Sequence, residues 1–165
     1  MTEMTKSGYH HYIAELESNT EVFRFMFSEM PAQLYVWKPS AEEPCALEVL
    51  CLLLDEEKAD FGNRMNQYLQ GTFTENIHLD KKNWSVERKY MDQNFHEKLQ
   101  EFLAQRKKTA EWLQSLENIQ WKENQLGRKF APVTAEMILT DWLSNDYTHI
   151  RQILHLKFDY IKNLS

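Results

Sequence analysis

Glycine and proline are scarce in this chain, and their positions limit most strongly the folds that it can adopt. The sequence has four Gly and four Pro, and most of them fall in clusters between long segments that lack both residues. Gly and Pro are the residues that most often interrupt regular secondary structure. Since the uninterrupted segments carry apolar residues at helical spacing, the sequence predicts long amphipathic helices and an all-α fold.

The first two predicted helices are defined by apolar stripes and by the residues that end them. The first helix ends at Pro31, and the second begins near Pro44 and ends at Gly71. The stripe of the first helix consists of Tyr9, Ile13, Leu16, Thr20, Phe23, Phe27 and Met30. The stripe of the second consists of Leu47, Leu50, Leu54, Phe61, Met65 and Tyr68.

The last two predicted helices begin at residues that suit a helix N-terminus. Asn94 and Glu97 have the spacing of a capping box, and Thr134 can cap the final helix. The third stripe consists of Phe95, Leu99, Phe102, Arg106, Thr109, Leu113 and Leu116. The fourth consists of Ile138, Trp142, Asn145, His149, Gln152, Leu156 and Tyr160. Residues 72–92 lack sustained periodicity, and so long a link lets the second and third helices run parallel. We therefore expect a four-helix bundle with a long crossover connection between helices two and three.

Length and composition predict one domain over residues 1–165. Hydrophobic residues make up 42% of the chain, which is enough for one core, and no shift in composition marks a boundary.

The formal net charge of −6 argues against nucleic acid as a partner, and the run Arg106-Lys107-Lys108 is predicted to be a solvated helix face. The chain shows no secretory signal and no apolar run long enough for a membrane span, so no membrane association and a cytoplasmic location are expected.

The two cysteines are expected to be unreactive free thiols. Cys45 and Cys51 would project from different faces of the second helix, too far apart for a disulfide. Cys51 also lies in the apolar run from Val49 to Leu54, where burial raises the pKa of a thiol.

The last helix places polar side chains where a bundle is normally apolar. Asn145 and His149 lie one turn apart on its inward stripe, which is a spacing that metal ligands use. The alternative is that His149 is a hydrogen-bonded core residue. The other histidines are expected on the surface or in packing contacts, and they are His10, His11, His78, His96 and His155.

Several segments resemble the DinB/YfiT-like family of four-helix bundles. The stretch from Trp142 to Ile153 is similar to the last-helix pattern of that family. Weaker similarities are found at residues 84–88, 112–116 and 127–134, and together they span residues 31–162. In this family, two histidines on the last helix and a third near the start of the second helix bind a divalent metal.

The resemblance implies a metal site that two substitutions leave incomplete. The second histidine of the last helix corresponds to His149, the first corresponds to Asn145, and the third ligand position corresponds to Leu52. An amide is a poor ligand for zinc or nickel, and a leucine has no lone pair to offer. We therefore expect no metal cofactor, and a residual pocket around Leu52, Asn145 and His149 that is either a small-molecule site or a vestige.

Substitute ligands for zinc or nickel are an alternative. Glu48, Asp55 and Glu56 lie about one turn from Leu52, so one of these carboxylates can reach toward His149.

Three hypotheses about function follow. The first is a metal-free and non-enzymatic DinB-like protein with a degenerate site. The second is a metal-dependent thiol transferase or hydrolase-like enzyme with atypical ligands, as family members with intact ligands include thiol transferases. The third is a homodimeric structural or interaction protein, by analogy with related bundles.

Overall fold

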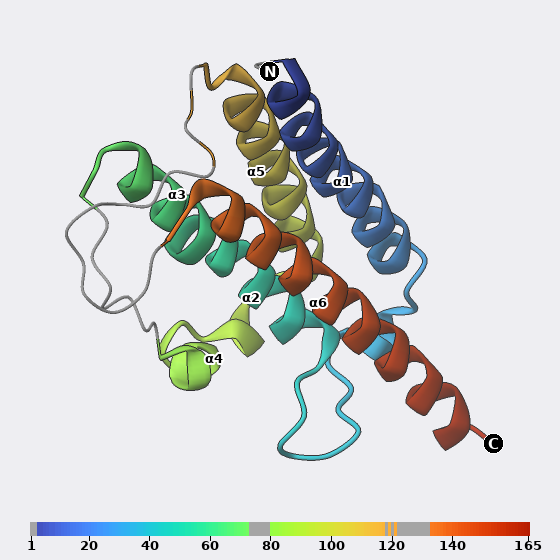
Figure 1. The fold of residues 1–165 in the computed structure, drawn as a ribbon. Coiled ribbons are helices and arrows are strands. Elements are labelled where there is room, and N and C mark those ends of the chain that lie inside the picture. The colour runs from blue at the N-terminus through green and yellow to red at the C-terminus, as the bar shows by residue number, and fades with distance from the viewer. Residues whose placement is uncertain (1–2, 73–79, 118, 120, 122–132) are drawn as a thin grey trace.

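The computed structural model describes residues 3–72, 80–117, 119, 121 and 133–165, and the regular secondary structure of these residues is entirely helical (Figure 1). The prediction of an all-α fold is confirmed. Within the described ranges, none of the helices is long and apolar enough to cross a membrane.

Long helical segments make up most of the molecule, and short helices connect them. The long segments are α1 (Glu3–Ser28), α2 (Ala46–Asp55) continued by the π-helix η2 (Glu56–Phe61) and α3 (Gly62–Leu69), α5 (Phe95–Ser115) and α6 (Ala135–Asn163). The short ones are η1 (Ala32–Tyr35), η3 (Lys81–Asn83), α4 (Trp84–Glu87) and η4 (Tyr90–Asp92). Helices α1 and α2 each pack against both α5 and α6.

The predicted helix ends are largely confirmed. Asn94 Oδ1 accepts a hydrogen bond from the Glu97 amide at 3.0 Å, and Thr134 Oγ1 accepts one from the Met137 amide at 3.1 Å. Gly71 follows α3 with a φ of 67°, a left-handed conformation that glycine adopts without strain. The predicted loop residues Gly127 and Pro132 lie outside the described residues.

The apolar core consists of two halves with a polar layer between them. The predicted stripe of α1 is buried from Tyr9 to Met30, and it contributes to both halves. In one half, the rings of Phe23 and Phe102 meet edge to face at 5.5 Å. In the other half, Phe61 stacks on Trp142 at 5.4 Å. Buried polar residues between these halves come from all four long segments.

The π-helix η2 presents three acidic residues to the interior in quick succession. Glu56, Glu57 and Asp60 are all buried, between the apolar residues of α2 and those of α3. A π-helical turn contains one extra residue, so it shifts the inward face of everything that follows it. Gly62 accepts this geometry because it has no side chain: a Cβ atom there would lie 2.6 Å from the carbonyl oxygen of Glu57.

This contact predicts an inverted effect for a helical glycine substitution. Gly→Ala in a helix normally stabilises a protein by about 0.5–1 kcal/mol. Gly62→Ala should instead lower the free energy of unfolding by about 1–3 kcal/mol, since the backbone has to shift to relieve the clash. Urea denaturation measures this, with Asn66→Ala on the same helix as the control. A stabilised Gly62→Ala protein would show that the π-helical turn is absent.

Candidate functional site

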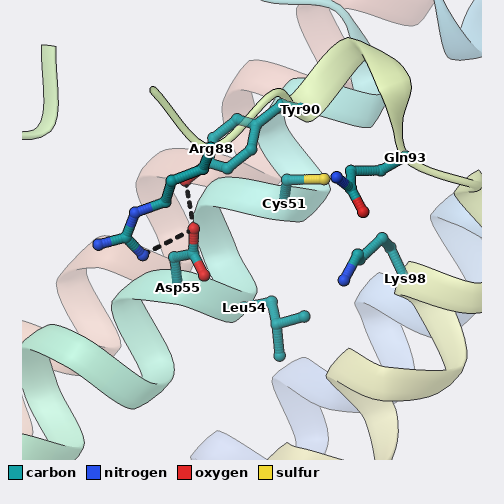
Figure 2. A pocket seen from close by; sticks show the side chains of 7 residues that line it. All are labelled: Cys51, Leu54, Asp55, Arg88, Tyr90, Gln93 and Lys98. Atoms are coloured by element: carbon teal, nitrogen blue, oxygen red, sulfur yellow. Dashed lines mark hydrogen bonds and ion pairs between the residues drawn. The ribbon is translucent and has the colours of Figure 1, made fainter. Parts of the chain in front are cut away.

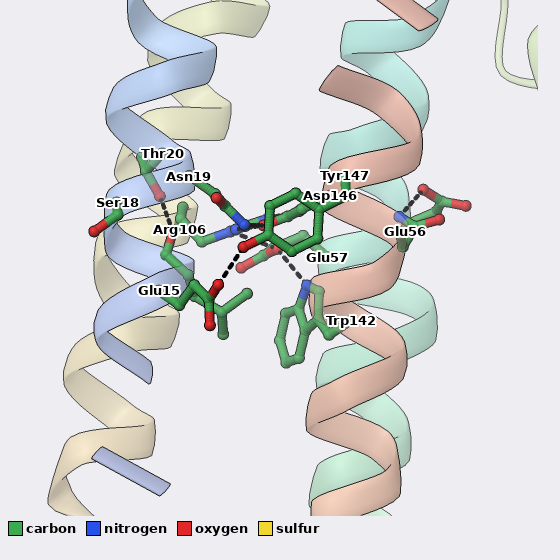
Figure 3. Close-up of polar contacts among 12 residues, drawn as sticks. Glu15, Ser18, Asn19, Thr20, Glu56, Glu57, Arg106, Trp142, Asp146 and Tyr147 are labelled. Atoms are coloured by element: carbon green, nitrogen blue, oxygen red, sulfur yellow. Dashed lines mark hydrogen bonds and ion pairs between the residues drawn. The ribbon is translucent and has the colours of Figure 1, made fainter. Parts of the chain in front are cut away.

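The centre of the polar layer is the guanidinium group of Arg106. This side chain is 1% exposed and lies between α1, η2 and α6 (Figure 3). Its Nη1 and Nη2 donate to the two carboxylate oxygens of Asp146 at 2.7 and 2.8 Å, and its Nε donates to Glu57 Oε2 at 2.9 Å. Two further donors complete the layer: Trp142 Nε1 binds Glu57 Oε2 at 3.0 Å, and Asn19 Nδ2 binds Asp146 Oδ2 at 3.2 Å.

The buried group contains one cation and two acids, and burial and neighbouring charges together shift the pKa values of Arg106 and Glu57. Burial lowers the pKa of Arg106, but Glu57 and Asp146 more than compensate and raise it above its ordinary value. For Glu57, burial raises the pKa, and the nearby Arg106, Thr109 and Trp142 only partly offset that rise. Burial therefore makes the Glu57 carboxyl group easier to protonate than a carboxyl group in water. Its second oxygen, Oε1, is buried and has no hydrogen-bond partner among the described residues.

The predicted solvated face at residues 106–108 is wrong for Arg106. Lys107 and Lys108 are exposed, but Arg106 is fully buried by the two acids that it binds. Asn19 of α1 is also buried, and it donates a hydrogen bond to Asp146. Asp146 and Glu57 were not predicted as inward residues, although each occupies a position that continues an apolar stripe at helical spacing.

A second cluster lies next to the first and is built around Glu56. Its Oε2 contacts His149 Nε2 at 3.0 Å and accepts a hydrogen bond from Asn145 Nδ2 at 2.8 Å. Its Oε1 binds Lys81 Nζ at 2.7 Å, and the same ammonium pairs with Asp60 at 2.6 Å. The other ring nitrogen of His149, Nδ1, lies 3.0 Å from Gln152 Oε1. Both oxygens of Glu56 and both nitrogens of His149 therefore have partners inside the protein.

These partners keep Glu56 ionised. Burial alone would raise the pKa of this carboxyl group, but hydrogen bonding and charge from His149, followed by Lys81 and Asn145, lower it to about 2. A carboxylate that accepts several hydrogen bonds and faces a cation is stabilised in its charged form. His149 Nε2 faces this carboxylate, which can only accept hydrogen bonds, so Nε2 donates the hydrogen of this contact and offers no lone pair to a metal ion.

The three residues predicted to line a pocket can now be placed. Asn145 and His149 meet on Glu56, while Leu52 is half-buried one turn before Glu56 and packs on the apolar core. Of the carboxylates considered as substitute ligands, Glu56 is the one that reaches His149. Leu52 offers no electron pair, Asn145 presents its N–H group, and His149 is already paired, so these positions do not fit a three-ligand metal site. In the described part of the chain, no three His, Cys, Asp or Glu side chains are grouped closely enough to hold a metal ion.

The other two carboxylates on α2 have different partners. Glu48 caps its own helix by accepting from the Cys45 amide at 3.0 Å, and it also pairs with Lys38 at 2.7 Å. Asp55 accepts from the Tyr90 hydroxyl at 2.6 Å. The histidines that were predicted to lie outside the site are exposed where the structure describes them, namely His10, His11, His96 and His155. His78 lies outside the described residues.

A small pocket of about 110 Å³ lies on another side of α2 and contains one of the cysteines (Figure 2). Cys51 lines it together with Asp55, Arg88 and Lys98. Asp55 is paired with Arg88 at 2.9 Å, and burial raises the pKa of the Cys51 thiol to about 12. The expectation that burial raises this thiol pKa is confirmed, and a thiol that stays protonated at neutral pH is a poor nucleophile.

Comparisons with known proteins support the fold. No protein-family model and no curated protein matches this chain. Among solved structures, the chain is similar to a crystal structure of a protein from Streptococcus pneumoniae, with a TM-score of 0.65 and 14% sequence identity over 90% of each chain. At that identity the likeness shows the fold alone.

The pairing of Glu56 predicts a specific dependence of stability on pH. The pKa of Glu56 is about 2 in the folded state against an ordinary value of 4.5, so its stabilisation is complete above about pH 4.5 and is lost as the pH falls toward 2. Glu56→Gln should therefore reduce the free energy of unfolding by on the order of 3 kcal/mol at pH 7, and the deficit should shrink toward pH 2.

Glu101→Gln is the matched control for this measurement. Glu101 also pairs with a lysine at 2.7 Å, but it is exposed, so its replacement should change stability by less than about 1 kcal/mol at any pH. A deficit of Glu56→Gln that stays constant from pH 7 to pH 2 would show that the charge of Glu56 does not stabilise the fold.

Proposed function

We propose that this chain is a metal-independent protein of the DinB/YfiT-like class, in which the Glu56–His149 contact replaces the metal centre of that class. In this proposal the protein acts by binding another molecule and not as a metal-dependent thiol transferase. The observation that carries the proposal is the complete pairing of His149, whose Nε2 lies 3.0 Å from Glu56 and whose Nδ1 lies 3.0 Å from Gln152. An imidazole whose two nitrogens both lie at hydrogen-bond distance from partners in the protein has no free electron pair for a metal ion.

The arrangement of the long helices supports the class assignment. In Figure 1 the segment α2–α3 and helix α5 run in the same direction, and α1 and α6 run in the opposite one. This is the topology expected for a four-helix bundle with a long connection between its second and third long helices. A cytoplasmic location and the exclusion of nucleic acid remain predictions from the sequence.

The rival function is a metal-dependent thiol transferase or hydrolase-like enzyme with atypical ligands. One observation favours this enzyme. His149 Nε2 and Glu56 Oε2 lie 3.0 Å apart, which is close enough for both atoms to bind one zinc or nickel ion. Against it, the ammonium of Lys81 lies 2.7 Å from Glu56 and already neutralises the carboxylate that the ion would need.

Metal analysis distinguishes these two functions. Protein produced without a histidine tag should contain far less than one zinc or nickel ion per chain. Its thermal unfolding midpoint should not rise with zinc, nickel or manganese, because only an ion that binds the native state stabilises it. Stoichiometric metal that is lost in His149→Ala, and retained in the control variant of the exposed His155, His155→Ala, would establish the metal-dependent alternative instead.

An exposed apolar face supports a homodimer as the form in which the protein acts. On α6, Leu154, Phe158 and Ile161 are 57%, 57% and 61% exposed and follow one another at helical spacing. On the neighbouring α1, Phe25 is 68% exposed. A row of large apolar side chains along one helix suits pairing with a second copy of itself across a two-fold axis.

Replacing Phe158 tests the homodimer. Sedimentation should show a dimer for the natural sequence and a monomer for Phe158→Glu. The stability of the monomer should be nearly unchanged because this side chain is exposed. A natural protein that remains monomeric at millimolar concentration would rule out this interface.

A further inference from the structure

Helices α1 and α6 lie side by side and run in the same direction (Figure 1). The Tyr147 hydroxyl of α6 donates a hydrogen bond to Glu15 of α1. Further along both segments, Glu29 lies near enough to Lys157 for its charge to act on this ammonium group. These two contacts determine which residues of α1 and α6 lie at the same level along the bundle.

Large apolar side chains are exposed on the adjoining sides of these two helices. Residues seven apart lie on the same side of a helix, since two turns contain about seven residues. Val22 follows Glu15 at this interval, so it lies on the side of α1 next to α6. Leu154 and Ile161 continue the same interval from Tyr147, so they lie on the side of α6 next to α1. The α1–α6 face consists of Val22, Phe25, Leu154, Phe158 and Ile161, which are all exposed.

The two outer edges of the α1–α6 face carry opposite charges. On α6, Arg151 and Lys162 are exposed on the edge away from α1, and no acidic side chain is exposed in the second half of this helix. On α1, Glu17 and Glu21 are exposed one turn apart on the edge away from α6. Arg24 pairs with Glu21 at 3.1 Å, which leaves this edge with a net negative charge. The face is therefore apolar in the middle, basic along α6 and acidic along α1.

This order of charges distinguishes the two ways in which a two-fold axis can lie in the face. If the axis runs across the helices, α6 packs on α6 of the partner subunit, and the two basic edges oppose each other. If the axis runs along the helices, α6 packs on α1 of the partner subunit, and each basic edge meets an acidic edge. Like charges that face each other across an interface weaken it, and opposite charges fix its register. The acidic edge likewise disfavours an anionic membrane as the partner of this face.

We propose that the two-fold axis of the homodimer runs along the α1–α6 face, so that Arg151 faces Glu21 of the partner subunit. This inference rests on the homodimer proposed above and adds its arrangement. Arg151 lies about 6 Å beyond Tyr147 along α6, and Glu21 lies about 9 Å beyond Glu15 along α1. Rotation about an axis parallel to the helices preserves these levels, so the two long side chains can meet. Each contact occurs twice in a two-fold dimer.

Charge reversal tests this arrangement by sedimentation equilibrium. Arg151→Glu and Glu21→Arg should each weaken dimerisation by about tenfold or more, because each variant places like charges together at both contacts. The double variant Arg151→Glu/Glu21→Arg should dimerise within about threefold of the natural protein, because the opposite charges are restored. An equal mixture of the two single variants should form heterodimers with the same recovered affinity.

Lys108→Glu is the matched control for these variants. It changes the net charge as much as Arg151→Glu does, but Lys108 is an exposed residue of α5 beside α3, away from the α1–α6 face. Its dimerisation should equal that of the natural protein. A general effect of net charge would instead weaken the control and Arg151→Glu alike, and would contradict the assigned contact.

The outcomes separate this arrangement from the homodimer on which it rests. A dimer that neither single variant weakens, or that the double variant does not recover, would overturn the arrangement while the homodimer stands. A natural protein that remains monomeric would overturn both. If that monomer also sedimented with vesicles of phosphatidylglycerol, the α1–α6 face would be a membrane contact and not a subunit interface.

Discussion

The buried guanidinium group of Arg106 is the interaction on which the rest of this structure depends. It comes from α5, binds Glu57 of η2 and Asp146 of α6, and is linked through Asp146 to Asn19 of α1, so all four long segments meet on one cation. The desolvation of these charges is costly, and only geometry that satisfies their hydrogen bonds makes it tolerable. The polar layer therefore requires a specific register of all four segments, whereas the apolar halves on either side of it tolerate more variation.

Glu56 and Glu57 are consecutive in sequence, but their side chains bind different partners: Glu57 binds Arg106 and Glu56 binds His149. Glu57 reaches toward α5, and Glu56 reaches toward His149 on α6. The π-helical turn brings both carboxylates inward, and Gly62 allows that turn to form. A local change in helical geometry thus links the Arg106 layer and the His149 cluster.

The sequence was sufficient for the features that depend on local interactions. The caps at Asn94 and Thr134, the left-handed Gly71 and the buried stripe of α1 follow from residue types at fixed short spacings. The burial of Arg106 was not predicted, although the residue lies on the inward stripe, because a cation there is explained only by acids on two other helices. The sequence also did not determine which residue pairs with His149. Three carboxylates were within reach, and only the packing of the helices brings Glu56, and not the other two, into contact with the imidazole. The π-helical turn also depends on these distant contacts, and the glycine at position 62 is its one local sign.

The most direct test of the central role of Arg106 is the free energy of unfolding of Arg106→Met at pH 7, compared with Lys107→Met. Methionine retains most of the apolar volume of arginine but leaves Glu57 and Asp146 buried without their cation. We expect Arg106→Met to lose about 3–5 kcal/mol and Lys107→Met to change by no more than about 0.5 kcal/mol. The loss should become smaller as the pH falls, because the raised pKa of Glu57 favours protonation of this carboxyl group, which removes one of the two unpaired charges. If Arg106→Met were as stable as Lys107→Met at pH 7, the buried cation would not be what holds the four segments together.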